Sequence, residues 1–181
     1  MRTVPQLRRV VHPSYAPSRF RSVYLPLLLY ANPSLHSRPE TPMSLDHIRI
    51  VLIEPQHPGN IGAAARAMKT MSLSQLVLVR PREFPSFEAE RRAVGAGDIL
   101  NAARVVDDVG DAIGDCRLVV GCSARNRGVL HELFDARQCA AQLLGETASG
   151  DPAAVMFGTE RTGLENHDLD RCNYQVVIPA N

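Results

Sequence analysis

The sequence predicts an α/β fold: a single domain built on a parallel sheet, with helices on both faces. Two observations lead to this prediction. Short apolar runs rich in β-branched residues recur along residues 43–181, and stretches with helical character separate them. Uninterrupted apolar runs are typical of strands buried on both faces, and strands that alternate with helices are typical of parallel sheets.

Six strands follow from the apolar runs. Each is a short, mainly apolar segment such as IRIVLI or CRLVVGC, and the weakest of them is ARVV. Runs of this length are too short for helices of ordinary size, which favours strands. The strands are expected at residues 48–53, 76–79, 103–106, 116–122, 153–158 and 174–178.

Helices and loops fill the intervals between these strands. In PGNIGAAARAMKTM, turn residues give way to small helix-forming residues, and residues 107–115 carry acids in their first turn, where the helix dipole favours them. RPREFPSFE is expected to be a proline-broken loop, and SARNRGVLHELF a long loop. Helices are expected at residues 62–71, 88–94, 107–115, 135–144 and near 165–172.

Residues 1–42 have a different composition from the rest of the chain. They contain seven of the thirteen prolines, six arginines and one acid, Glu40, with no sustained periodicity. Such a segment cannot form a regular backbone ladder or bury a continuous apolar face, so disorder is the expectation. The simplest interpretation is that Met43 is the biological start, which makes residues 43–181 the domain. A functional basic tail is the alternative.

Composition excludes several classes of protein. No window approaches the roughly 18 consecutive apolar residues of a membrane span. Residues 43–181 carry a net charge of about −4, so a broad basic surface for nucleic acid is absent and any RNA contact must be local. The four cysteines form no CxxC pair, which argues against a zinc site or a disulfide framework. We expect reduced thiols in a cytoplasmic protein that binds no metal.

The loops that follow the strands point to one edge of the sheet. EPQHPGNIG, GCSARNRG, GTERTGLEN and PAN come after the first, fourth, fifth and sixth expected strands. In open parallel sheets, ligands bind at the carboxyl ends of the strands. These loops are irregular and carry Gly and Asn. A simple connection between a strand and a helix does not require four loops of this kind at one edge. The sequence therefore predicts the functional site at this edge.

Each motif is ambiguous when taken alone. PGNIG can be a tight turn with Asn60 as a helix N-cap, and it lacks the GxGxxG spacing of a dinucleotide site. Arg66 stands alone among the small residues of AAARAM, which suggests close approach by an anion such as phosphate. In FGTERTGLE, Glu160 and Arg161 can be a surface ion pair in an ordinary connection. Arg125 and Arg127 can form an exposed basic loop.

The joint order of these motifs resembles a known family. GNIGAAARAM, GCSAR, FGTERTGL and a final VVIPAN follow one another as in the SpoU/TrmH class of RNA ribose 2′-O-methyltransferases, which have the knotted SPOUT (trefoil-knot) α/β fold. IRIVLIEPQHPGNIGAAARAMKTM, AVGAGDIL and GCSARNRGVL most resemble its TrmJ branch. This branch methylates cytidine or uridine at position 32 of the tRNA anticodon loop. The resemblance covers residues 48–181.

The resemblance implies a cofactor and roles for particular residues. S-adenosylmethionine is expected to bind backbone groups of three loops, and tRNA is the expected substrate. The family's first-motif arginine corresponds to Arg66, with Asn60 setting the loop that presents it, and the second-motif glutamate corresponds to Glu160. Because a guanidinium hardly ever deprotonates, Arg66 is expected to hold phosphate and stabilise an alkoxide rather than act as a base. The positions expected at the cofactor are Cys122, Ser123, Ala124, Gly158 and Ile178.

The resemblance also implies an assembly and reveals one departure. Family members are homodimers in which the first-motif loop approaches the partner's cofactor site, so a homodimer is expected. The family's third motif, which closes the knot, would follow Asn181 and is absent from this sequence. One alternative is therefore a non-catalytic RNA-binding module. A methyltransferase that acts on ribosomal RNA is the near alternative within the same class, and a generic nucleotide-binding protein is a third.

Overall fold

The computed structural model describes residues 45–123 and 133–177, which belong to one compact unit, Glu40–Asn181. The expectations for residues 1–42 and for the arginines of the 124–132 segment lie outside these described residues and stay predictions. Along the described ranges, no helix is long and apolar enough to cross a membrane.

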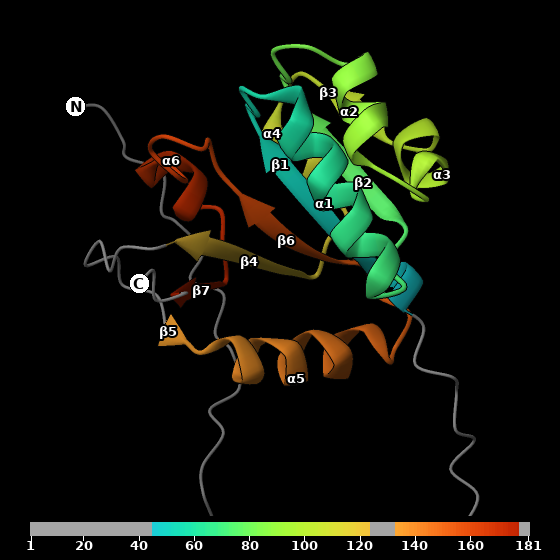
Figure 1. Ribbon diagram of the computed structural model, residues 1–181. Helices are drawn as coiled ribbons and strands as arrows, with labels where there is room; N and C mark the ends of the chain where they lie inside the picture. Colours follow the sequence, from blue (N-terminus) through green and yellow to red (C-terminus); the bar gives the residue numbers. More distant parts are fainter. Residues whose placement is uncertain (1–44, 124–132, 178–181) are drawn as a thin grey trace, which may run out of the picture. The chain divides into compact units, whose positions relative to one another are not determined.

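A seven-stranded sheet forms the centre of the described unit, in the order β3-β2-β1-β6-β4-β7-β5 (Figure 1). Every pairing between neighbouring strands is parallel, which confirms the predicted fold class. The strands are β1 (Ile48–Ile53), β2 (Gln75–Val79), β3 (Arg104–Val106), β4 (Leu118–Ser123), β5 (Leu133–Phe134), β6 (Ala153–Phe157) and β7 (Tyr174–Val177).

The shortest strand, β5, falls where the sequence predicts only loop. Leu133 and Phe134 pair with Gln175 and Val176 of β7, and the Phe134 ring stacks on Tyr174 with centroids 4.5 Å apart. Two residues are too few to show a strand pattern in sequence. Their extended conformation comes from pairing with a strand forty residues later, which only the folded chain provides.

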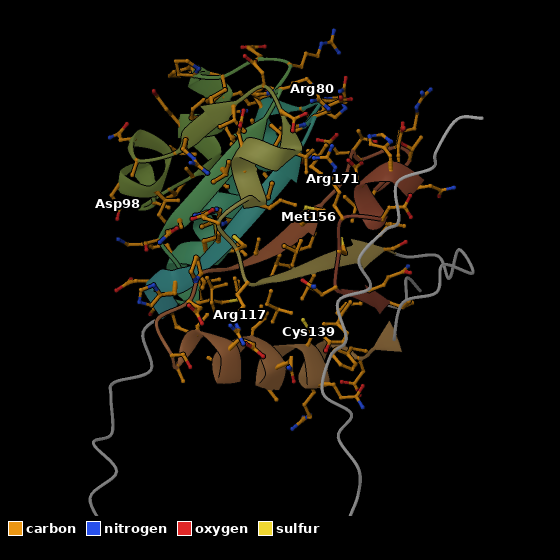
Figure 2. The ribbon with its side chains drawn as sticks, turned by 180° about the vertical axis from the view of Figure 1, so that it is seen from behind. Arg80, Asp98, Arg117, Cys139, Met156 and Arg171 are labelled. Carbon is orange, nitrogen blue, oxygen red and sulfur yellow. The ribbon has the colours of Figure 1, made fainter. Side chains whose placement is uncertain are left out.

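Helices cover both faces of the sheet, as predicted. One apolar cluster joins the sheet to α1, α2, α3 and α5, with residues such as Ile61, Ala89 and Cys139. The opposite cluster joins it to α4 and the α6 region, through Val109 and Leu169. Figure 2 shows Cys139 between α5 and the sheet. The helices are η2 (Leu45–His47), α1 (Pro58–Thr70), α2 (Phe87–Arg92), α3 (Gly97–Asn101), α4 (Val109–Ile113), α5 (Ala136–Thr147) and α6 (Asn166–Leu169).

Helix α1 begins four residues before its predicted start. Pro58 occupies the first turn, where its missing N–H and fixed φ are favourable, and His57 is the N-cap residue. Asn60 is therefore an internal helix residue, and the interpretation that it caps the helix is wrong. The five-residue α3 was also not predicted, because it is too short to show a helical period.

Gly62 of PGNIG allows α2 to lie against α1. A Cβ on Gly62 would lie 2.1 Å from the carbonyl oxygen of Ala89, which no real side chain can do. One on Gly59 would meet only the ends of the Glu88 and Arg92 side chains, which can move aside. The backbone of α2 thus approaches α1 directly at Gly62, and a helix-packing requirement explains this glycine of the motif.

A buried arginine ties β1 to the loop after α4. Arg49 is 7% exposed, and its guanidinium donates to both carboxylate oxygens of Asp115, at 2.7 and 2.9 Å, and to the carbonyl of Ala112. Hydrogen bonding from Arg49 lowers the pKa of Asp115 to about 2. The carboxylate of Asp115 thus neutralises the positive charge of Arg49, which lies in a strand that is otherwise apolar.

Candidate active site at the carboxyl edge of the sheet

Three adjacent strands end together at one edge of the sheet. Strand β4 lies between β6 and β7, with Cys122 opposite Phe157 on one side and Val176 on the other. Gly158 follows β6 directly, and Ser123 is the last residue of β4. The structure thus brings Cys122, Ser123 and Gly158 to neighbouring strand ends, as the sequence predicts. The other two predicted cofactor positions, Ala124 and Ile178, lie just outside the described residues.

The loop after β6 folds tightly back on itself. Thr159 and Gly163 form an antiparallel bridge, Gly163 has a φ of +71°, and the hydroxyl oxygens of Thr159 and Thr162 are 2.7 Å apart. A Cβ on Gly158 would lie 2.1–2.2 Å from backbone atoms of Gly163 and Leu164. Only glycine fits at this strand end, because the returning backbone occupies the space of a side chain.

The side chain of Cys122 is neutral. Burial raises the pKa of its thiol to about 12. A thiol that keeps its proton is a poor nucleophile. Across the residues that the structure describes, no group of three or more His, Cys, Asp or Glu could hold a metal ion. The strand ends therefore present backbone groups and small uncharged side chains, which suit a ligand bound through its shape and hydrogen-bonding edges.

Glu160 ties the loop after β6 to the start of α1. Its carboxylate accepts hydrogen bonds from the backbone N–H groups of Gln56 (3.0 Å) and His57 (3.3 Å) and from the Nδ2 amide of Asn60 (3.0 Å). Burial raises the pKa of Glu160, but the hydrogen bonds outweigh burial and the pKa lies below its usual value. Glu160 is thus ionised at neutral pH with its oxygens engaged, which suits an ordering role.

Two cavities flank this carboxylate. A polar one of about 390 Å³ includes Glu54, His57, Thr159, Arg161 and Thr162. An apolar one of about 270 Å³ lies between α1, β1 and β6 and includes Asn60, Met68, Phe157, Gly158 and Glu160. The sequence did not single out Gln56, His57, Thr159 or Thr162, because their part depends on backbone N–H groups and loop closure rather than on a charged side chain.

Arg66 lies apart from the other predicted catalytic residues. Its exposed side chain borders a third cavity, with Ala63, Arg91, Arg92 and Val94, whereas Asn60 and Glu160 border the first two. Asn60 and Arg66 project from different faces of α1. Within the described part of one chain, the structure brings Asn60, Glu160 and Gly158 together and does not bring Arg66 to them.

Comparison with known proteins gives consistent matches. A family model described as the SpoU rRNA Methylase family matches residues 47–181. The tRNA (cytidine/uridine/adenosine-2′-O-)-methyltransferase TrmJ of Pseudomonas aeruginosa is 51% identical over 137 residues, which is 76% of this chain and 53% of that protein. The chain thus spans about half the length of the curated relatives it matches.

Solved structures agree with this match. A probable methylase family protein from Haemophilus influenzae is similar with a TM-score of 0.70 and 47% identity, over 76% of this chain and 57% of that one. TrmJ from Z. mobilis is similar with a TM-score of 0.68 and 38% identity, over 74% and 58%. A family match across residues 47–181 and these likenesses in sequence and fold lead to one conclusion: the chain belongs to the SpoU rRNA methylase family.

Proposed function

We propose that this protein transfers a methyl group from S-adenosylmethionine to the ribose 2′-hydroxyl of cytidine or uridine in the anticodon loop of tRNA. The observation that carries the proposal is the meeting of Gly158, Cys122 and Ser123 at the ends of two adjacent strands, β6 and β4, where the family resemblance expects the cofactor. The identity of 51% to a tRNA methyltransferase favours tRNA over ribosomal RNA as substrate.

The residues at the strand ends fit this cofactor. They offer backbone groups at Cys122, Ser123 and Gly158, with Ala124 and Ile178 as the expected continuation, and the missing side chain at Gly158 lets the loop after β6 close tightly over the strand end. When bound, S-adenosylmethionine supplies an electrophilic methyl group on a sulfonium. The Cys122 thiol stays protonated, so it would not compete with the ribose as a nucleophile when the cofactor is bound.

The chain's own residues would position the ribose and manage charge. Asn60, Glu160 and the N–H groups of Gln56 and His57 hold the start of α1 against the loop after β6. Arg66 holds an RNA phosphate and stabilises the negative charge that develops on the 2′-oxygen. A guanidinium is suited to both tasks because it stays protonated and donates through a planar fork.

The separate position of Arg66 supports a homodimer. Arg66 faces a different cavity from Asn60 and Glu160 in one chain, and in a dimer a second copy would bring this arginine to the partner's cofactor site. The family resemblance implies the same arrangement. A protein that acts on tRNA in this way belongs in the cytoplasm. Light scattering that gives the mass of a single chain for the full-length protein would contradict the dimer.

Three measurements on the full-length protein test the proposed function. Calorimetric titration with S-adenosylmethionine should show binding, and transfer of labelled methyl should be faster to tRNA than to a ribosomal RNA fragment. The modified nucleotide should resist alkaline cleavage at its 3′ side, because the 2′-oxygen is blocked. RNA binding without cofactor binding would instead identify a non-catalytic RNA-binding module, and faster transfer to ribosomal RNA would reassign the substrate.

A further inference from the structure

Three arginines converge around one surface cavity, and the proposed chemistry uses only one of them, Arg66. The cavity has a volume of about 320 Å³ and is lined by Ala63 and Arg66 of α1, by Arg91 and Arg92 of α2, and by Val94. All three arginine side chains are exposed. Residues 43–181 carry a net charge of about −4, so this concentration of positive charge is local and runs against the rest of the domain.

Packing between α1 and α2 places the three arginines together. A Cβ on Gly59 would lie 3.0 Å from Nε of Arg92, and a Cβ on Gly62 would lie 3.0 Å from Cβ of Arg92. Gly62 therefore makes room for α2 and for the base of the Arg92 side chain. Arg66 lies one turn after Gly62 on α1, so the close packing of α1 and α2 determines the shape of the cavity.

The positive charges at this cavity are mostly uncompensated. Arg92 has one weak partner, since its Nε lies 3.5 Å from Oε1 of Glu88. No ion pair involves Arg66 or Arg91 among the residues that the structure describes, whereas Lys69, one turn beyond Arg66, pairs with Asp98 at 2.6 Å. Like charges held close together repel unless an anion neutralises them. The cavity is thus suited to an anion rather than to a further protein cation.

The surroundings favour a nucleic-acid phosphate. Guanidinium groups bind phosphate through paired hydrogen bonds, and several of them can bind one phosphate together. Phe87 lies one turn before Arg91 on α2 and is 79% exposed. An exposed aromatic ring beside arginines is typical of surfaces that contact unstacked RNA bases.

We propose that Arg91 and Arg92 of α2 form, with Arg66, a binding site for an RNA backbone phosphate. This inference rests on the proposed function, because it takes tRNA as the ligand, and it adds a contact on α2 beyond the Arg66 of the reaction itself. Arg91 and Arg92 are positioning residues: they hold the RNA, whereas Arg66 also addresses the reacting ribose.

The test compares one double variant and two single variants in the full-length protein. Arg91→Ser with Arg92→Ser should raise the KM for tRNA about tenfold with kcat changed less than about twofold, because phosphate contacts act on binding. The slope of log affinity against log salt should become shallower by about one to two, as expected when one or two phosphate contacts are lost. Arg91→Glu alone should weaken tRNA binding further than Arg91→Ser, since it adds repulsion.

Matched controls separate this site from general charge effects and from misfolding. Arg137→Ser removes an exposed helix arginine of α5 and should leave the KM and the salt slope unchanged. Thermal unfolding and affinity for S-adenosylmethionine should match the wild type in all variants. An unchanged tRNA KM and salt slope in the Arg91 and Arg92 variants, or equal effects from Arg137→Ser, would overturn the proposal.

The readouts also separate this proposal from the proposed function. If the wild type binds tRNA but transfers no methyl group, and the Arg91 and Arg92 variants bind tRNA more weakly with a shallower salt slope, the methyltransferase proposal fails and the phosphate site stands. If the wild type methylates tRNA and the α2 variants behave like the wild type, the phosphate site fails and the enzyme assignment stands.

Discussion

The strand-end site and the arginine cavity use different physical means to prepare for a ligand. At the strand ends, backbone geometry and hydrogen bonds dominate: Gly158 has no room for a side chain, and Glu160 is held by three donors. At the arginine cavity, exposed and mostly unpaired charges dominate. The first region is closely packed and tied by hydrogen bonds, which suits orientation of a small molecule. The second is charged and open, which suits a long polyanion.

This comparison predicts that changes at the two regions affect different measurements. Substitutions at the strand ends should alter folding and cofactor affinity. Substitutions at the arginine cavity should alter RNA binding or turnover while the fold stays intact.

The largest expected effect is that of Arg66→Ala. Turnover should fall about 100-fold or more, as when a donor to a developing oxyanion is lost, with the fold and cofactor affinity nearly unchanged. Arg66→Lys should restore little activity, because an ammonium lacks the planar fork. The assay uses full-length protein, anticodon stem-loop RNA and labelled cofactor. Near-normal turnover in Arg66→Ala, or lost cofactor affinity, would contradict the role of this residue.

A glycine substitution at the strand ends should act on stability instead. Gly158→Ala forces a Cβ to within 2.2 Å of the backbone of Gly163, so we expect a loss of about 1–3 kcal/mol of unfolding free energy and weaker cofactor binding. Gly145→Ala in α5 is the control: it meets open space and should stabilise the helix by roughly 0.5–1 kcal/mol. Urea unfolding measures the unfolding free energy of both variants. Equal stability of the two would contradict the close approach of the backbone at Gly158.

Glu160→Gln distinguishes an ordering role from a general base. The amide puts an NH₂ group among N–H donors, so turnover should fall by about tenfold through misplacement of the start of α1. The pH–rate profile should keep its shape, because we expect a group other than Glu160 to determine the pH dependence. Disappearance of the acid limb in this variant would instead assign proton transfer to Glu160.

The smallest effect concerns the pair that lies in neither region. The folded-state pKa of Asp115, about 2, is below the unfolded value of about 3.9, so its stabilisation is present above about pH 4 and is lost as the pH falls toward 2. The Asp115 side chain is 60% exposed, so we expect less than about 1 kcal/mol. Urea unfolding at pH 5 and pH 3 should show a smaller drop for Asp115→Asn than for the wild type.

Sequence patterns determined the fold class and the edge of the sheet that carries the site. Six apolar runs predicted six of the seven strands, because a strand buried on both faces must be apolar along its whole length. The same logic placed Cys122, Ser123 and Gly158 at strand ends, and parallel pairing then guarantees that they share one edge. These features are local or follow from general rules of α/β topology, so the chain by itself is sufficient to predict them.

Tertiary structure alone decided three further features. Strand β5 exists because Leu133 and Phe134 meet β7, and Asn60 lies inside α1, where it reaches Glu160 a hundred residues away. The sequence of α2 alone does not mark Arg91 and Arg92 as functional. They lie near Arg66 because Gly62 allows α2 to pack closely against α1. Each of these depends on contacts between segments distant in sequence. No local pattern encodes such a contact, because its free energy arises only when both segments are in place.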